Sequence, residues 1–131
     1  MPITDTSWLY AFLDELDVHH EEAIAQAKQA DQLAIPGPVV AEFLHLVHYR
    51  VRKSSGEAEA HRAARQALQD LSTTPTVSLL DGADLHGAAG IYHRHPKLSF
   101  VDAVAIAAAL RGQDRLLTFD KVQRAALAKE R

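Results

Sequence analysis

Four short apolar segments alternate with longer stretches of helical periodicity, and this alternation limits the folds that the chain can adopt. The short segments are residues 3–4, 33–35, 76–80 and 115–119. Strands that are separated by helices pair in parallel, because a parallel connection needs a crossover. The sequence therefore predicts a three-layer α/β/α sandwich with a short parallel sheet. Since 131 residues suit one compact unit, we expect a single domain over residues 1–131.

The helical stretches have recognisable beginnings and ends. Helices are expected over residues 8–13, 19–30, 39–51, 57–71, 81–93 and 100–110, with a last helix after residue 120. Pro38 suits the first turn of the third helix, which Ser54-Ser55-Gly56 closes. Asp81 is expected to begin the fifth helix, and Gly112 to end the sixth.

Composition excludes several classes of protein. The net charge is −3, so no global basic field points to nucleic acid. Arg50, Arg52 and Lys53 form a local basic group, which a solvated helix end explains at least as well as a phosphate contact. The chain has no cysteine, which excludes disulfides and thiolate metal sites. No apolar run reaches membrane-spanning length and no secretory signal is visible, so we expect a cytoplasmic protein that does not enter a membrane.

Four acidic residues follow strand-like segments or lie near helix starts. They are Asp5, Glu42, Asp102 and Asp120. Strand-to-helix junctions of a parallel sheet lie on one edge, so these carboxylates are expected to meet there. Each also has a purely structural explanation: Asp5 and Asp120 suit helix N-caps, Glu42 suits an early helical turn, and Asp102 follows Ser99 at nearly capping-box spacing.

The position of Asp102 in the sequence favours a role beyond helix capping. It interrupts an otherwise apolar helix, and no basic residue close in sequence offsets its charge. A carboxylate held against a core helix is costly unless something pairs with it. A divalent cation between the clustered carboxylates would offset both this cost and their mutual repulsion, and such a site suggests phosphodiester chemistry.

Four segments in a fixed order carry a resemblance to a known family. They are Asp5-Thr6-Ser7, Val39-Val40-Ala41-Glu42, Leu98-Ser99-Phe100-Val101-Asp102-Ala103 and Leu116-Leu117-Thr118-Phe119-Asp120. Together they resemble the PIN-domain ribonucleases of the bacterial VapC toxin type, over essentially the whole chain. The resemblance implies a PIN-like fold and an endoribonuclease that depends on Mg²⁺ or Mn²⁺. It also implies an RNA substrate, a small antitoxin protein that inserts a segment into the active-site groove, and a homodimer.

The resemblance also implies the site residues. The metal-binding and catalytic acids would be Asp5, Glu42, Asp102 and Asp120, with Thr6 or Thr118 as a hydrogen-bonding neighbour. Magnesium keeps several waters, so one or two direct carboxylates suffice, and we expect Asp5 and Asp102 to lie closest to the first ion. The other two acids would act through water or at a second ion.

The eight histidines suggest a different metal site. Adjacent His19 and His20 point to different sides of a helix, whereas His45 and His48 can share a face. No acid at helical spacing accompanies that second pair, so we expect surface or core histidines rather than zinc ligands.

Other interpretations remain open from the sequence. Trp8, Tyr10 and Phe12 favour a core or dimer contact over base stacking. Asp81 is the rival metal ligand if the strand order differs from the expected one. A phosphate-accepting signalling domain is a competing class, although it typically carries an acidic pair where Asp5 stands alone. A PIN scaffold that binds RNA or protein without cutting is the other alternative.

Overall fold

A computed structural model describes residues 1–131 and contains a four-stranded sheet with the strand order β3-β2-β1-β4. The strands are β1 (Ile3–Thr4), β2 (Leu33–Pro36), β3 (Val77–Leu80) and β4 (Leu116–Leu117). All neighbouring strands are parallel, which confirms the predicted sheet. Strand β4 is shorter than residues 115–119 because only its two leucines pair with β1.

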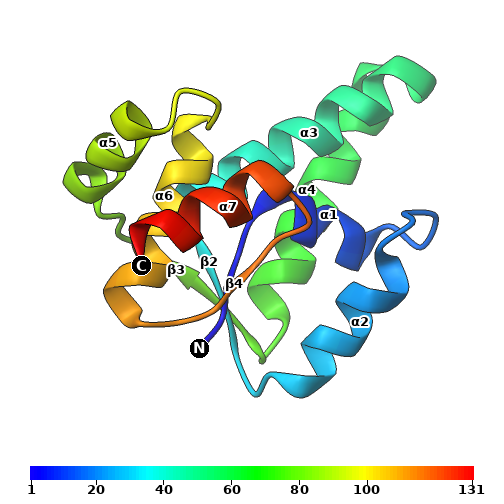
Figure 1. The fold of residues 1–131 in the computed structure, drawn as a ribbon. Coiled ribbons are helices and arrows are strands. Elements are labelled where there is room, and N and C mark those ends of the chain that lie inside the picture. The colour runs from blue at the N-terminus through cyan, green and yellow to red at the C-terminus, as the bar shows by residue number, and fades with distance from the viewer.

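Seven helices flank this sheet (Figure 1). They are α1 (Thr6–Leu13), α2 (His20–Gln29), α3 (Gly37–Ser55), α4 (Glu57–Thr73), α5 (Leu85–Arg94), α6 (Phe100–Gly112) and α7 (Lys121–Glu130). Figure 1 shows α3 and α4 running side by side as a hairpin whose tip projects from the body of the molecule. The α/β/α architecture expected from the sequence is therefore confirmed.

The hydrophobic core consists of several clusters, which join the helices to one another or to the sheet. One joins α5, α6 and α7 and includes Val104 and Ile106, which expose 1% and 0% of their surface. Another joins α1 and α2 to the sheet through Trp8, which is fully buried. The small alanines of α6 let this helix pack closely, which explains why it is the most buried helix. The prediction that Trp8 is a core residue is confirmed.

Several predicted boundaries differ from the structure by a few residues, and two of these differences have a clear physical reason. Helix α5 begins at Leu85 rather than at Asp81, because the side chain of Asp84 accepts the Gly87 N–H at 2.8 Å and closes the first turn. Strand β2 extends to Pro36, one residue beyond the predicted segment 33–35, since a missing donor is tolerated at a strand end. Helix α6 ends at Gly112, as predicted, and the left-handed residue that follows it is Gln113, with φ of 54°.

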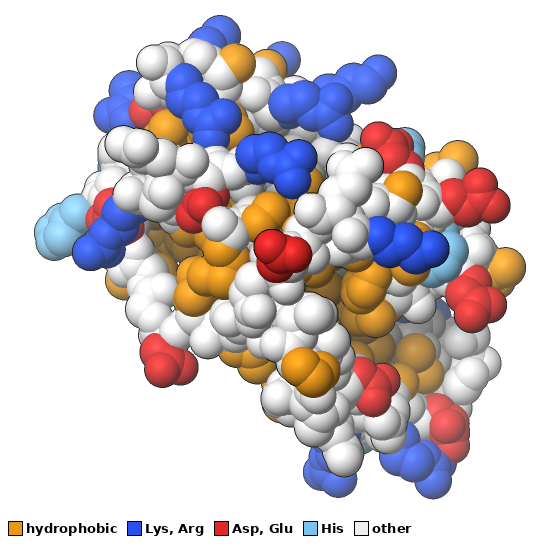
Figure 2. All heavy atoms as spheres, turned by 90° about the horizontal axis from the view of Figure 1, so that it is seen from below, with side chains coloured by type: hydrophobic (Ala, Val, Ile, Leu, Met, Phe, Trp, Pro, Cys, Tyr) orange, Lys and Arg blue, Asp and Glu red, His pale blue; other side chains and the backbone are white.

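The surface carries mixed charge. Figure 2 shows, on the face seen from below in Figure 1, Lys and Arg side chains interspersed with Asp and Glu. Several of the Lys and Arg side chains lie in the upper part of this view, and most of the Asp and Glu side chains lie elsewhere on the same face. None of the helices combines the length and the apolar character needed to cross a membrane.

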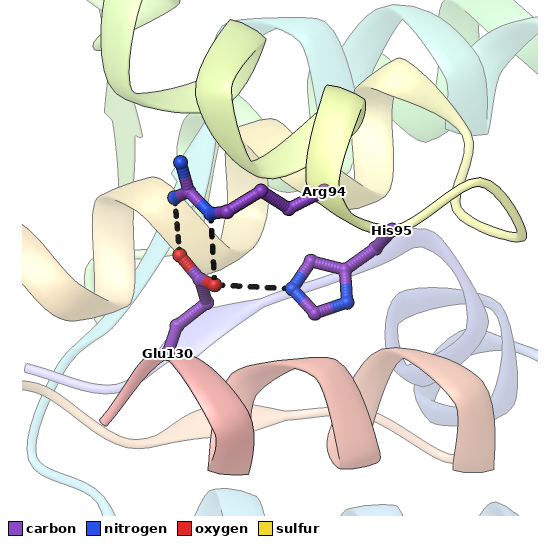
Figure 3. Close-up of polar contacts among 3 residues, drawn as sticks. All are labelled: Arg94, His95 and Glu130. Atoms are coloured by element: carbon purple, nitrogen blue, oxygen red, sulfur yellow. Dashed lines mark hydrogen bonds and ion pairs between the residues drawn. The ribbon is translucent and has the colours of Figure 1, made fainter.

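Glu130, at the end of α7, ties this helix to the end of α5 (Figure 3). Arg94 donates two hydrogen bonds to the Glu130 carboxylate, one of them from Nε at 3.2 Å, and His95 Nε2 lies 3.1 Å from the same group. The Arg94 hydrogen bonds are the main cause that lowers the pKa of Glu130 to about 2. Glu130 therefore stabilises the fold above its unfolded pKa of 4.5, and this contribution is lost as the pH falls from there towards 2.

The substitution Glu130→Gln is expected to lower the free energy of unfolding by about 1 kcal/mol at neutral pH, because it removes a charged bidentate partner. Urea denaturation measures this change. The control is Glu59→Gln, which breaks an exposed ion pair with Arg62 and should cost less than about 0.5 kcal/mol. Equal effects of the two substitutions would contradict the proposed role of Glu130.

Candidate active site

All four acidic residues singled out by the sequence line one cleft of about 390 Å³. Asp5 follows β1, Glu42 lies on α3, Asp102 lies on α6 and Asp120 precedes α7. Four other surface hollows have similar volumes of about 410 to 430 Å³, so size does not mark this cleft. What distinguishes this cleft is its number of carboxylates, because Asp17 adds a fifth to the four predicted acids. Asp81, the rival ligand, lies in a different hollow.

Asp5 is the most buried of these acids and exposes 2% of its surface. It caps α1 by accepting the Trp8 N–H at 2.8 Å, as predicted. The Ser7 hydroxyl lies 2.9 and 3.0 Å from its two oxygens, and Thr118 also bonds to it. Burial nevertheless raises the pKa of Asp5 to about 6, and the charge of Asp102 acts in the same direction. The site thus holds a carboxylate that resists ionisation when no cation is present.

Asp102 combines a structural role with a half-buried charge. It forms the capping box anticipated from the sequence: its N–H donates to Ser99 Oγ at 3.1 Å, and its Oδ2 accepts the Ser99 N–H at 3.4 Å. Its other oxygen bonds to no protein group. Burial raises the pKa of Asp102, and the charges of Asp120 and Glu42 raise it further. These carboxylates therefore lie close enough to repel one another.

Asp120 and Glu42 also keep oxygen atoms free for a ligand. Asp120 caps α7 through Oδ1 alone, which accepts the N–H groups of Val122 and Gln123 at 2.8 and 3.2 Å. Glu42 has no hydrogen bond to any protein group. None of the cleft acids forms an ion pair within 4.0 Å, so their charges lack a protein partner.

This donor set fits a hard divalent cation. Carboxylate oxygens are the ligands that Mg²⁺ and Mn²⁺ prefer. No three of the cleft carboxylates bring oxygens within 4.8 Å of one another, because the one such group of three in the molecule lies elsewhere. Magnesium tolerates such spacing, since it binds through one or two carboxylates and keeps several waters.

A buried polar chain links Asp5 to Asp102 behind the cleft. The Thr118 hydroxyl contacts both Asp5 Oδ2 and, at 2.8 Å, Gln123 Oε1. Gln123, which is fully buried, donates from Nε2 to the Asp102 carbonyl at 3.2 Å. The Thr118 hydroxyl donates to Asp5, and this hydrogen bond lowers the pKa of Asp5 and so partly opposes the effect of burial.

Several lining residues were not predicted as site residues. Ser7, rather than Thr6, supports Asp5, since the Thr6 hydroxyl has no hydrogen-bond partner. Tyr10 lines the cleft with Arg50, whose guanidinium lies 4.0 Å from the centre of the Tyr10 ring. His19 stacks on Phe119 at 4.3 Å between ring centres.

Divalent cation binding is expected to weaken as the pH falls through 6, because a proton on Asp5 competes with the ion. Titration with Mn²⁺ should give an affinity about tenfold lower at pH 5 than at neutral pH. Asp5→Asn should remove the pH dependence near 6 together with most of the affinity. An affinity that stays constant across this range in the unsubstituted protein would contradict the expectation.

Comparison with known proteins bears on the fold and the family. The structure is similar to that of VapC20 from Mycobacterium tuberculosis, described as a sarcin–ricin-loop-cleaving toxin, with a TM-score of 0.75 and 24% identity over 96% of this chain and 95% of that one. It is also similar to PAE2754 from Pyrobaculum aerophilum, with a TM-score of 0.68 and 20% identity over 95% and 83% of the two chains. No curated protein sequence matches the chain significantly. A family model described as the PIN domain matches residues 3–128, and the chain therefore belongs to the PIN domain family.

Proposed function

We propose that this protein is a metal-dependent endoribonuclease, the toxin component of a toxin–antitoxin pair. The observation that carries the proposal is the convergence of Asp5, Glu42, Asp102 and Asp120 in one cleft without cationic partners. Membership of the PIN family supports a nuclease, and likeness to the fold of a VapC toxin supports the toxin role.

The residues divide into ligands and positioning groups. Asp5 and Asp102 would hold Mg²⁺ or Mn²⁺ most directly, and the other two acids would act through water or at a second ion. When bound, the ion supplies positive charge to the phosphate and lowers the pKa of the attacking water. Ser7 and Thr118 fix the orientation of Asp5 through its two oxygens. These hydrogen bonds keep the carboxylate directed into the cleft.

The proposed antitoxin would bind beside the acidic cleft. An apolar hollow between α1, α3 and α4 adjoins the acidic cleft and shares Tyr10 with it. Its apolar lining includes Leu13, Phe43 and Val47. Such a hollow supports the docking of an antitoxin segment that continues into the cleft. A homodimer and a cytoplasmic location are part of the same proposal.

RNA binding requires local positive charge, since the protein is acidic overall. Arg50 is the one Lys or Arg that lines the cleft, so we expect Arg50→Gln to weaken RNA binding about tenfold while sparing cation binding. The matched control is Arg52→Gln, which removes the same charge from α3 outside the cleft. The KM for RNA measures the effect. Equal changes in the two variants would show that Arg50 is only part of a solvated helix end.

Cleavage of a panel of structured and single-stranded RNAs tests the proposed function. We expect cleavage with Mg²⁺ or Mn²⁺, none with EDTA, and recovery when the ion is restored. Because phosphate contacts are screened by salt, the rate should also fall as ionic strength rises. If the protein binds the ion but cuts no RNA in the panel, the inert PIN scaffold becomes the better interpretation.

A further inference from the structure

We propose a second metal site, for Zn²⁺ or a similar late transition ion, at the turn that joins α3 to α4. Its ligands are His48 on α3 and Glu57 and His61 on α4, whose ligand atoms all lie within 4.8 Å of one another. None of these three residues lines the acidic cleft. The site is therefore separate from the proposed nuclease centre and uses a different donor set.

The distances are close to those that a tetrahedral ion requires. Glu57 Oε1 lies 3.4 Å from His48 Nε2 and 4.0 Å from His61 Nε2. The two imidazole rings are 4.8 Å apart between centres, at 65° to each other. Zinc bonds of about 2.0–2.1 Å place neighbouring donors roughly 3.3 Å apart. Glu57 and His61 are exposed, so small side-chain rotations complete the site.

A buried nitrogen atom of His48 without a hydrogen-bond partner supports the binding of a metal ion at this turn. His48 Nε2 is buried and makes no hydrogen bond. Buried nitrogen atoms are normally satisfied, so this one calls for an explanation. Glu57 has no Lys, Arg or His side chain within 4.0 Å other than the two histidines. A cation bound between the three side chains satisfies both the nitrogen and the carboxylate.

The backbone explains how residues from two helices converge. Gly56, with φ of 86°, reverses the chain between α3 and α4, and this places His48 beside Glu57. Glu57 and His61 are four residues apart and share one face of α4. The acid that His48 lacked within its own helix is thus supplied across the turn.

The ligand types select the ion. Two imidazoles and one carboxylate suit Zn²⁺, whereas Mg²⁺ prefers oxygen ligands alone. Three protein ligands leave the fourth position of a tetrahedral ion for water. The ion would fasten α3 to α4 near the tip of the hairpin that carries Glu42 and Arg50.

Zinc titration of the full chain, stripped with EDTA and then returned to excess Mg²⁺, tests the proposal by calorimetry. We expect one Zn²⁺ per chain and a higher melting temperature with zinc. His61→Ala should lower the zinc affinity at least roughly tenfold, since even partners that only orient a ligand are worth that much. His45→Ala, which removes an exposed histidine of α3 outside the group, should leave the affinity unchanged.

Two further variants test a second proposed ligand and the separation of this site from the acidic cleft. Glu57→Gln should also weaken zinc binding, and both Glu57 and His61 are exposed, so neither substitution endangers the fold. Asp102→Asn should retain zinc binding, which separates this site from the acidic cleft. Equal zinc affinity in His61→Ala and the unsubstituted protein, or loss of zinc binding in Asp102→Asn, would overturn the proposal.

Discussion

Asp102→Asn is expected to reduce metal-dependent RNA cleavage by about a thousandfold or more while leaving the fold intact. The substitution removes a charge that would hold the cation, and interactions with a catalytic ion are worth several kcal/mol, at about 1.4 kcal/mol for each factor of ten. The amide oxygen of Asn can still accept the Ser99 N–H, so the capping box that begins α6 is preserved.

A capping acid outside the cleft provides the matched control for this variant. Asp84 also accepts a backbone N–H at a helix start, as the N-cap of α5, and it lines a different hollow, so Asp84→Asn should leave cleavage unchanged. Initial rates with Mg²⁺ or Mn²⁺, with circular dichroism to check the fold, measure both variants. Full activity of Asp102→Asn would show that this residue only caps its helix.

Asp5→Asn is expected to change activity and stability in opposite directions. It should abolish cleavage, yet raise the free energy of unfolding of the metal-free protein by about 2–3 kcal/mol at neutral pH. The physical reason is burial, which raises the pKa of Asp5 from 3.8 to about 6, so the ionised group destabilises the fold. Asn has no charge to bury and is an equally good N-cap for α1.

The raised pKa of Asp5 also predicts how the free energy of unfolding changes with pH. Because the folded protein binds the Asp5 proton more tightly than the unfolded chain, stability falls as the pH rises from about 3.8 to 6 and then levels off. Urea denaturation in EDTA should therefore show a gain for Asp5→Asn at pH 7 that disappears towards pH 4. Excess Mg²⁺ should reduce the difference in free energy of unfolding between Asp5→Asn and the unsubstituted protein, because the ion stabilises the unsubstituted protein. A destabilised Asp5→Asn variant would contradict the account of its burial.

Local sequence patterns predicted the sheet, most helices and the meeting of the acids, for identifiable reasons. Short apolar runs between helices imply parallel strands, and the junctions of such strands lie at one edge. Asp5 and Asp120 were visible as caps because capping depends on neighbours two or three residues away. The helix start at Leu85 was missed because Asp81 and Asp84 offered equivalent signals, and only the folded backbone distinguishes them.

Contacts between distant segments could not be read from the sequence. Gln123 stands three residues after Asp120, at capping-box spacing, but its side chain reaches the Asp102 carbonyl instead. Likewise, the approach of Arg50 to Tyr10 depends on how α1 packs against α3. Both arise from tertiary packing, which overrides local patterns.

Manganese binding tests most directly whether the cleft carboxylates jointly bind a divalent cation. Calorimetric titration should show a site in the unsubstituted protein that is lost in Asp5→Asn and in Asp102→Asn and kept in His61→Ala. The last variant excludes the histidine group at the α3–α4 turn as the source of the signal. If Mn²⁺ binds as tightly to both Asp variants as to the unsubstituted protein, the cleft is not the metal centre.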